Sequence, residues 1–215
     1  EGNLEAIRTL VAVARRHPDN IDAIIIGSEN LLRQELTVEQ LQAYLRHARR
    51  ELAGLKVKVG YADSHDMLKR HPQIISEVDI VFANFYPYWE GYAIEDSLPA
   101  VQRAWQELLA ITGDKPVAIS ETGWPSCGNA VGKAIPSPEN SARYLREFRQ
   151  WAQREHVRYF YFSAFDASWK AEHEGPQGAC WGLFDENGAL KKGMTEALNG
   201  AATNTRPIHL QPADH

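Results

Sequence analysis

Five short strand-like runs, separated by segments of helical periodicity, constrain the fold of this chain more than any other feature. They lie at residues 21–27, 56–61, 78–83, 117–120 and 157–162. Each run is too short for a helix and is bounded by glycine, proline or polar residues, which is typical of strands. Because strands alternate with helices, the sequence predicts a parallel sheet built from βαβ crossovers.

The segments between the runs predict the helices that cover this sheet. Apolar residues recur at helical spacing over residues 4–16, 38–52, 97–112, 138–155 and 190–198. A further helix over 66–76 is interrupted near Pro72, since proline removes a backbone donor. Thr37 and Gln40 fit a capping box, and Ser137 is the expected N-cap of the helix that begins at Pro138.

The residues that follow the strands separate two classes of α/β fold. No glycine-rich phosphate loop follows any of them, which disfavours a nucleotide-binding doubly wound sheet. Acidic and aromatic residues follow them instead, as at the C-terminal face of a (β/α)8 barrel. The chain offers about five strand–helix units in 215 residues and begins on a helix, whereas a barrel has eight units in about 250 residues. We therefore expect residues 1–200 to form part of a (β/α)8 barrel without its N-terminal βα units, and residues 201–215 to form a loose tail.

Two of the strand runs end in a glutamate. Glu29 follows residues 23–28, and Glu121 follows residues 117–120 directly before a Thr-Gly-Trp-Pro sequence. A single glutamate in such a place is about as often a salt-bridged surface residue as a functional one. A pair is different, because most glycoside hydrolases work with two carboxyl groups that flank the bond to be broken.

Composition and residue spacing restrict the partners. A formal net charge of -5 disfavours nucleic acid, and no run approaches the roughly 18 apolar residues of a membrane span. The histidines show no metal-ligand spacing, so we expect no metal and no cofactor. Cys127 and Cys180 are too few for a disulfide scaffold, but they follow neighbouring strands, so that a disulfide between their loops is one option.

Taken together, these stretches resemble glycoside hydrolase family 17, the β-1,3-glucanases and glucanosyltransferases of a retaining (β/α)8 clan. The resemblance covers residues 21–192 and is most specific at residues 120–126 (SETGWPS), which are similar to the nucleophile signature of the family. Residues 84–88 resemble its sixth strand, and residues 165–170 and 181–184 resemble its eighth-strand region. The resemblance implies that this chain holds strands four to eight of the barrel.

The resemblance also implies roles. Glu121 would be the nucleophile and Glu29 the acid/base, a division that requires a raised pKa for Glu29 while Glu121 stays ionised. Tyr86 is the candidate to hydrogen-bond the nucleophile, with a core tyrosine as the alternative. The substrate would be β-1,3-glucan, and no residue decides whether water or a second sugar takes the glycosyl group.

Candidate substrate-binding residues lie close to the two glutamates in the sequence or after neighbouring strands. Trp89, Trp124 and Trp169 could stack on sugar rings, and each could equally pack in the core. Asp63 lies at a strand exit, where it could line the cleft or belong to a solvated loop. Ser28 occupies the position at which the family has an asparagine that binds the sugar 2-hydroxyl, and serine is shorter.

Other differences from the family pattern fall in the eighth-strand region. Ser163 and Ala167 stand where the family has glutamates, and Ser168 stands where it has proline. These changes concern the affinity of sugar subsites and leave the two catalytic carboxylates in place.

Two alternatives to an enzyme remain open from the sequence. One is a glucan-binding pseudoenzyme, and the other is an incomplete barrel whose exposed strand edges drive self-association. The family resemblance implies a periplasmic or extracellular location. No signal peptide is visible, but the chain begins at Glu1 instead of methionine, so that we expect an N-terminal segment to be missing.

Overall fold

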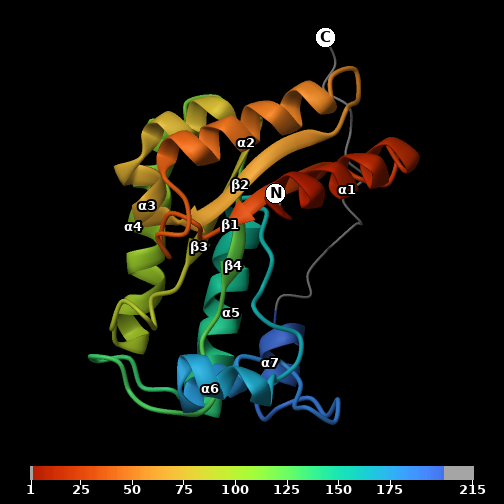
Figure 1. Cartoon of the computed structure of the whole chain (residues 1–215). Coiled ribbons are helices and arrows are strands. Elements are labelled where there is room, and N and C mark those ends of the chain that lie inside the picture. Colours follow the sequence, from red (N-terminus) through yellow and green to blue (C-terminus); the bar gives the residue numbers. More distant parts are fainter. Residues whose placement is uncertain (1, 201–215) are drawn as a thin grey trace.

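The computed structural model describes residues 2–200, which form a parallel sheet covered by helices. The strands follow each other in space as they do in the sequence: β1 (Ala23–Ser28), β2 (Lys58–Ser64), β3 (Ile80–Phe85) and β4 (Val117–Thr122) (Figure 1). Every neighbouring pair is parallel. The predicted βαβ arrangement is therefore confirmed.

Helices connect the strands and extend the chain beyond the sheet. The α-helices are α1 (Gly2–Arg16), α2 (Val38–Glu51), α3 (His65–Arg70), α4 (Ile94–Thr112), α5 (Pro138–Arg154), α6 (Ala171–Glu174) and α7 (Met194–Asn199). The 3-10 helices are η1 (Pro72–Glu77), η2 (Ser168–Lys170) and η3 (Pro176–Cys180). No helix in this part of the chain is long and apolar enough to cross a membrane.

Local sequence signals account for several helix boundaries. The Thr37 side chain accepts a hydrogen bond from the backbone of Gln40, whose side chain accepts one in return, so the predicted capping box is present. Ser137 caps α5 as expected. The helix α3 ends at Arg70 and η1 begins at Pro72, which confirms the predicted interruption.

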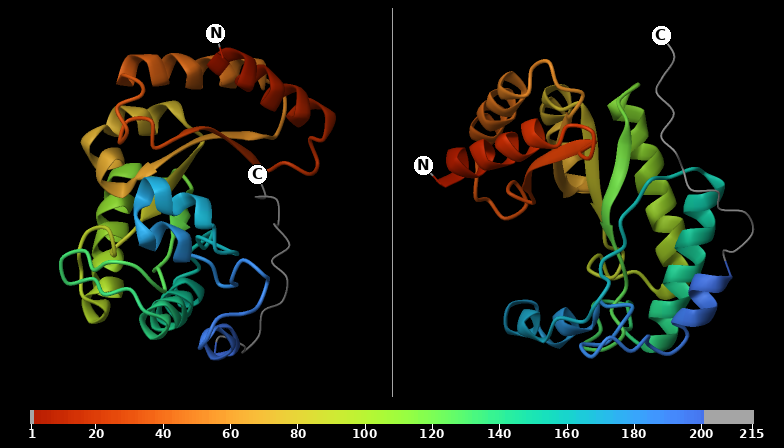
Figure 2. Two further views of the ribbon diagram at one scale, coloured as in Figure 1. Left: turned by 60° about the horizontal axis from the view of Figure 1, so that its bottom comes forward. Right: turned by 90° about the vertical axis from the view of Figure 1, so that its right-hand side faces the viewer.

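The two faces of the sheet differ in what covers them. Along β3, Val81, Ala83 and Phe85 belong to the large core that also contains the apolar faces of α1, α2, α4 and α5. Figure 2 shows α1 and α2 beside β1 and β2, and α4 and α5 beside β4. The alternate residues Ile80 and Phe82 face the other way and pack in a small cluster with alanines of β2 and β4. This alternation is the two-residue period of a strand, and both faces are apolar, as in sheets buried on both sides.

The prediction of a fifth strand over residues 157–162 is wrong. It runs beside β4 and makes three hydrogen bonds with it, among them Ile119 N to Arg158 O and Phe160 N to Ile119 O, both at 2.9 Å. Only Ile119 and Tyr159 form a bridge, so that the segment is extended but not a regular strand. Among the described residues no strand pairs with its other edge, and Phe160 remains 64% exposed. The predicted tail, 201–215, lies outside the described residues.

A disulfide joins Cys127 to Cys180, which settles the option that the sequence left open. Cys127 belongs to the loop between β4 and α5, and Cys180 ends η3. The bridge therefore ties the loop after Glu121 to the segment that leads into Trp181.

We expect the double variant Cys127→Ser/Cys180→Ser to lose about 4 kcal/mol of unfolding free energy, since the bridge closes a loop with a sequence separation of 53 residues. Denaturant unfolding measures this loss. Reductant should destabilise the parent chain and leave the variant unchanged. Equal unfolding midpoints for parent and variant would contradict the expectation.

Candidate active site

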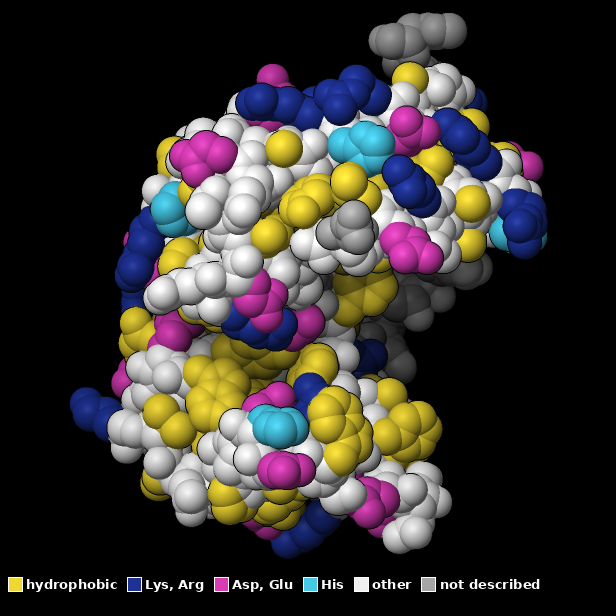
Figure 3. Space-filling model, in the orientation of Figure 1, with side chains coloured by type: hydrophobic (Ala, Val, Ile, Leu, Met, Phe, Trp, Pro, Cys, Tyr) yellow, Lys and Arg dark blue, Asp and Glu magenta, His cyan; other side chains and the backbone are white. Residues whose placement is uncertain are grey.

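A cavity of about 680 Å³ lies where β1, β2, β3 and β4 end. Figure 3 shows the same face of the molecule hollowed between the part formed by β1, β2 and α2 and the part that carries α6. Acidic side chains line the cavity together with Arg33 and Lys170, and these acids are Glu29, Asp66, Glu90, Glu121 and Glu174. The aromatic residues of its wall are His65, Tyr86, Trp89, Phe162 and Trp181. Both predicted catalytic glutamates thus share one cavity.

Glu121 is the penultimate residue of β4 and lies opposite Asn84 of β3 in the sheet register. Gly123 lies two residues after Glu121, and a Cβ atom at Gly123 would lie 2.1 Å from the carbonyl oxygen of Phe162. Only glycine therefore lets the segment at 157–162 come so close to β4. This approach closes the wall of the cavity beside Glu121.

Tyr86 donates its phenolic hydrogen to Oε2 of Glu121 over 2.7 Å, which is the contact expected from the sequence. Burial raises the pKa of Glu121, and the negative charge of Glu29 adds to the rise, whereas the hydrogen bond from Tyr86 lowers this pKa. The pKa of Tyr86 lies well above its ordinary value because the phenol is buried and faces the charge of Glu121. Tyr86 therefore stays protonated and acts as a fixed donor to the carboxylate.

The backbone at Glu29 takes a conformation that non-glycine residues seldom adopt. Its φ angle is 55°, and Gly27, two residues earlier, has a φ of 90°. The Glu29 N–H donates to the carbonyl of Ala62 in β2 over 2.8 Å, which anchors the turn to the sheet. A left-handed residue costs on the order of 1 kcal/mol or more, and such strain is concentrated at functional sites.

Two donors hold the Glu29 carboxylate. Asn84 Nδ2 donates to Oε1 and Arg33 donates to Oε2, each over 2.8 Å. Asn84 also accepts a hydrogen bond from Ser120 Oγ over 2.6 Å, so that it links Glu29 to the residue before Glu121. The sequence analysis did not identify Asn84 as a site residue. The sequence held a signal for it, because Asn84 is the polar residue that directly follows the apolar run 78–83.

The assignment of Glu121 as nucleophile and Glu29 as acid/base comes from the family resemblance and not from their contacts. Glu29 accepts hydrogen bonds from Asn84 and Arg33, and Glu121 accepts one from Tyr86. The division of roles depends on the family resemblance.

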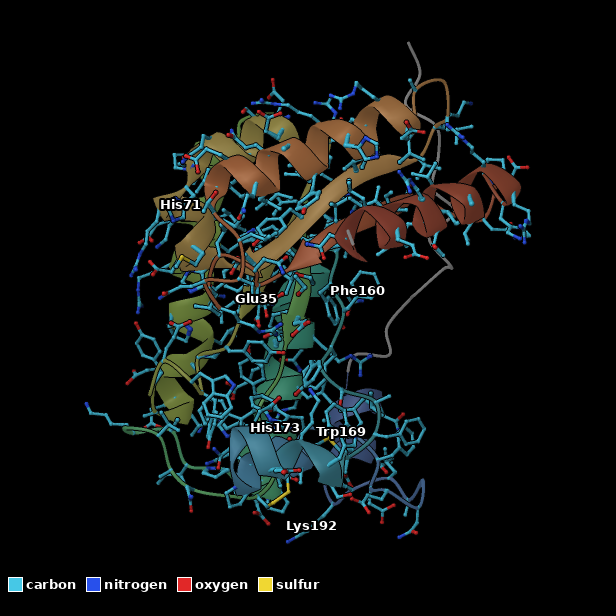
Figure 4. All side chains as sticks on the ribbon, viewed as in Figure 1. Glu35, His71, Phe160, Trp169, His173 and Lys192 are labelled. Atoms are coloured by element: carbon cyan, nitrogen blue, oxygen red, sulfur yellow. A yellow bond between two sulfur atoms is a disulfide. The ribbon has the colours of Figure 1, made fainter. Side chains whose placement is uncertain are left out.

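The three tryptophans selected from the sequence lie in different surroundings. Trp89 lines the cavity and is 39% exposed. The prediction that Trp124 stacks on a sugar is wrong. Trp124 is fully buried and its Nε1 donates to Ile135 O over 3.1 Å, so that it cannot present its ring to a sugar. Trp169 lies beside α6, exposed and outside the cavity lining (Figure 4). Trp181 is buried and forms part of the cavity wall.

Asp63 and Ser28 do not line the cavity. Asp63 is fully buried and accepts hydrogen bonds from Tyr61 Oη over 2.5 Å and from the backbone N–H of Ser64 over 2.7 Å. It supports the wall from behind, which corrects its assignment as a substrate ligand. Ser28 is half-buried within β1, where its backbone pairs with Ala62.

Lys170 is a second residue that the sequence analysis did not single out. Its Nζ lies 4.3 Å from the centre of the Phe162 ring and 3.5 Å from Glu174 Oε1, and its positive charge lowers the pKa of Glu121. Lys170 and Glu29 are about 140 positions apart, so that only the tertiary fold brings them to one cavity. Across residues 2–200, no group of three or more His, Cys, Asp or Glu residues could hold a metal ion.

Comparison with known proteins places these features in context. The family model described as the BtgE/BtgC glycoside hydrolase domain matches residues 2–182. A glucan 1,3-beta-glucosidase of Candida albicans is 28% identical over 197 residues, which cover 80% of this chain and 62% of that protein. A glucan 1,3-beta-glucosidase of Schizosaccharomyces pombe is 29% identical over 186 residues, covering 80% and 57%. The chain thus spans about three fifths of the length of these relatives.

Comparison with solved structures supports the same family and fold. A glycoside hydrolase family 17 beta-1,3-glucanosyltransferase from Rhizomucor miehei superposes with a TM-score of 0.77 at 27% identity, over 88% of this chain and 71% of that one. An active-site mutant of the same enzyme, in complex with laminaritriose, matches equally well. An endo-laminarinase from Formosa shares the fold alone, with a TM-score of 0.73 at 20% identity over 93% and 63% of the two chains. These matches confirm the family 17 resemblance and the α/β barrel class.

We expect Tyr86→Phe to raise the pKa of Glu121 further above its ordinary value, since the variant removes the hydrogen bond that lowers it. The ionised fraction of Glu121 at a given pH would fall, and the acidic limb of its titration would move to higher pH. Carbon-13 NMR titration of the Glu121 carboxyl group measures this.

Tyr88→Phe is the matched control, because the Tyr88 hydroxyl donates to Asn129 O and makes no contact with Glu121. An unchanged Glu121 titration in Tyr86→Phe would mean that the phenol does not hold the carboxylate in solution.

Proposed function

Because this chain belongs to the BtgE/BtgC glycoside hydrolase domain family, we propose that it is a retaining enzyme that hydrolyses or transfers β-1,3-glucan. One observation carries the proposal: Glu29 and Glu121 line one cavity, and Tyr86 donates to Glu121. The names of the relatives support the substrate, since two are glucan 1,3-beta-glucosidases and a solved neighbour was studied with laminaritriose.

In the proposed first step, an oxygen of the Glu121 carboxylate attacks the anomeric carbon of a bound glucose residue. The bond from that carbon to the glycosidic oxygen breaks, and the leaving oxygen takes the proton of Glu29. Tyr86 holds the attacking carboxylate in one orientation through its hydrogen bond. The product of this step is a glycosyl ester on Glu121.

In the second step, Glu29 acts as a base. It takes a proton from water or from a sugar hydroxyl, whose oxygen bonds to the anomeric carbon as the Glu121 carboxylate leaves. Water gives hydrolysis, and a sugar acceptor gives a longer chain. Asn84 bridges Glu29 to Ser120 and so keeps the two catalytic side chains in a constant relation during both steps.

We also propose that the chain works outside the cytoplasm, in the periplasm or the extracellular space. The Cys127–Cys180 disulfide supports this, because structural disulfides persist mainly in oxidising compartments.

The proposal predicts that this chain converts laminari-oligosaccharides and that Glu121→Gln and Glu29→Gln each lose at least about 10³-fold in turnover. Product masses report the outcome: shorter products alone indicate hydrolysis, and longer ones as well indicate transfer. Glu35→Gln is the control, since Glu35 lies on the same loop as Glu29 but outside the cavity lining (Figure 4). If the chain binds laminari-oligosaccharides without converting them, it is a glucan-binding module and the proposed enzymatic function is wrong.

The division of roles is tested by azide rescue with an aryl β-laminaribioside that has a good leaving group. In Glu29→Ala the glycosyl ester still forms, so azide should attack it and give a β-glycosyl azide. In Glu121→Ala azide should replace the nucleophile and give the α-glycosyl azide. The opposite pairing of variant and product would exchange the two roles and overturn the assignment.

A further inference from the structure

The loop that begins at Glu29 (residues 29–36, the Glu29 loop) has little apolar packing of its own. Within these residues, which the structure describes throughout, Leu31 alone is buried. The pairing of β1 with β2 is irregular between Ile25 and Ser28, so that the register of the sheet does not by itself fix the residues that follow. Other contacts must therefore hold Glu29 in place.

Two side chains of β2 hold the Glu29 loop. They add to the backbone hydrogen bond that the Glu29 N–H makes with this strand. The Leu31 N–H donates to Tyr61 Oη over 3.1 Å. The Leu32 N–H donates to Asp63 Oδ2 over 3.4 Å. The anchoring of the loop thus depends on which residues β2 carries and not only on its backbone.

Tyr61 and Asp63 form one directed chain of hydrogen bonds. The Tyr61 hydroxyl accepts from Leu31 and donates to Asp63 Oδ2 over 2.5 Å. Asp63 Oδ1 accepts from the Ser64 N–H over 2.7 Å. Burial raises the pKa of Tyr61, so that its phenol stays protonated and able to donate. Each of these contacts gives the Asp63 carboxylate a donor, as its ionised form requires.

Burying this pair costs free energy that apolar side chains would not cost. Tyr61 and Asp63 are both fully buried. Burial raises the pKa of Asp63, and the negative charge of Glu29 adds to the rise. If β2 needed only packing at these positions, apolar residues would stabilise it more simply. The pair does what apolar residues cannot do, because it supplies acceptors for the backbone of the Glu29 loop.

The two anchored residues lie between the ends of a clamp around Glu29. Arg33 donates its backbone N–H to the Glu29 carbonyl over 2.9 Å and its guanidinium to the Glu29 carboxylate over 2.8 Å. Leu31 and Leu32 lie between Glu29 and Arg33 in the chain, so that holding them holds both partners. The left-handed backbone at Glu29 is strained, and strain of this kind persists only where neighbouring contacts enforce it.

We propose that Tyr61 and Asp63 are positioning residues for the acid/base, which hold the Glu29 loop so that the Glu29 carboxylate faces the leaving oxygen of the substrate. Neither of them lines the cavity, so that they act through the loop. The inference rests on the proposed function, in which Glu29 protonates the leaving group. Weakening the pair should therefore impair proton transfer and leave the nucleophile Glu121 unaffected.

The test compares two substrates of the full chain that differ in their need for Glu29. Laminaritetraose has a sugar leaving group that must be protonated, whereas the leaving group of dinitrophenyl β-laminaribioside departs without a proton. The value of kcat/KM includes the steps up to formation of the glycosyl ester and no later one. We expect Tyr61→Phe and Asp63→Asn each to lower kcat/KM about tenfold or more for laminaritetraose, and less than about twofold for the aryl substrate.

Azide supplies a second readout that a merely structural effect would not move. A misplaced Glu29 slows the second step with the aryl substrate, in which it acts as a base. Azide needs no base, so it should raise kcat in Tyr61→Phe and Asp63→Asn, give a β-glycosyl azide, and leave the parent chain unchanged. A loss of folded protein would lower both substrates equally and would produce no response to azide.

Each variant removes one part of the hydrogen-bond chain. Tyr61→Phe deletes a single oxygen, and Asp63→Asn keeps the shape but replaces one acceptor by a donor. Because the two residues act in one chain, the double variant should lose less than the product of the two single losses. Tyr144→Phe is the matched control, since this buried phenol of α5 bonds to Thr122 over 2.6 Å instead of the Glu29 loop. It should leave the ratio of the two kcat/KM values unchanged.

The outcomes separate the positioning role from the proposed function. Glu29→Gln is the reference and should show the same selective loss, only larger. If Glu29→Gln shows it and neither Tyr61→Phe nor Asp63→Asn does, the positioning role is refuted while the function stands. It is refuted as well if both variants lose both substrates equally, or if thermal unfolding shows that neither folds. If the parent chain converts neither substrate, the proposed function fails and the positioning role fails with it.

Discussion

Parallel pairing of neighbouring strands is the constraint on which the rest of the structure depends. Since β1, β2, β3 and β4 run in the same direction, their C-terminal ends meet at one edge of the sheet. Side chains that are far apart in the sequence, such as Glu29 and Glu121, thereby reach one cavity. The crossover helices stabilise this arrangement by burying one face of the sheet in the main core.

Placing two carboxylates in one partly buried cavity is unfavourable, and the neighbouring residues offset this. Burial and the charge of Glu29 raise the pKa of Glu121, and the phenol of Tyr86 opposes the rise. Arg33 and Asn84 hold Glu29. The left-handed backbone at Glu29 adds strain that the pairing of β1 with β2 must balance. The stability of the sheet is thus what allows a polar, strained site to persist.

Much of the fold could be predicted because it is encoded in short stretches. The capping box at Thr37, the break at Pro72 and the buried run that becomes β3 depend on neighbours in the sequence. Residues 157–162 have the composition of a strand but pair too little to form one, since pairing depends on what lies at both edges. Asp63 and Trp124 are residue types that suit a cleft, and only packing shows that both are fully buried.

The sequence by itself determined the alternation of strands and helices, the two strand-end glutamates and the resemblance that relates them, because periodicity and motifs are local properties. The tertiary structure alone decided which side chains face the cavity. It joined Asn84 to Glu29, Cys127 to Cys180 and His65 to Glu90, pairs that are separated by 25 to 55 positions. Such contacts depend on strand register and on the path of the loops, and no local pattern records either.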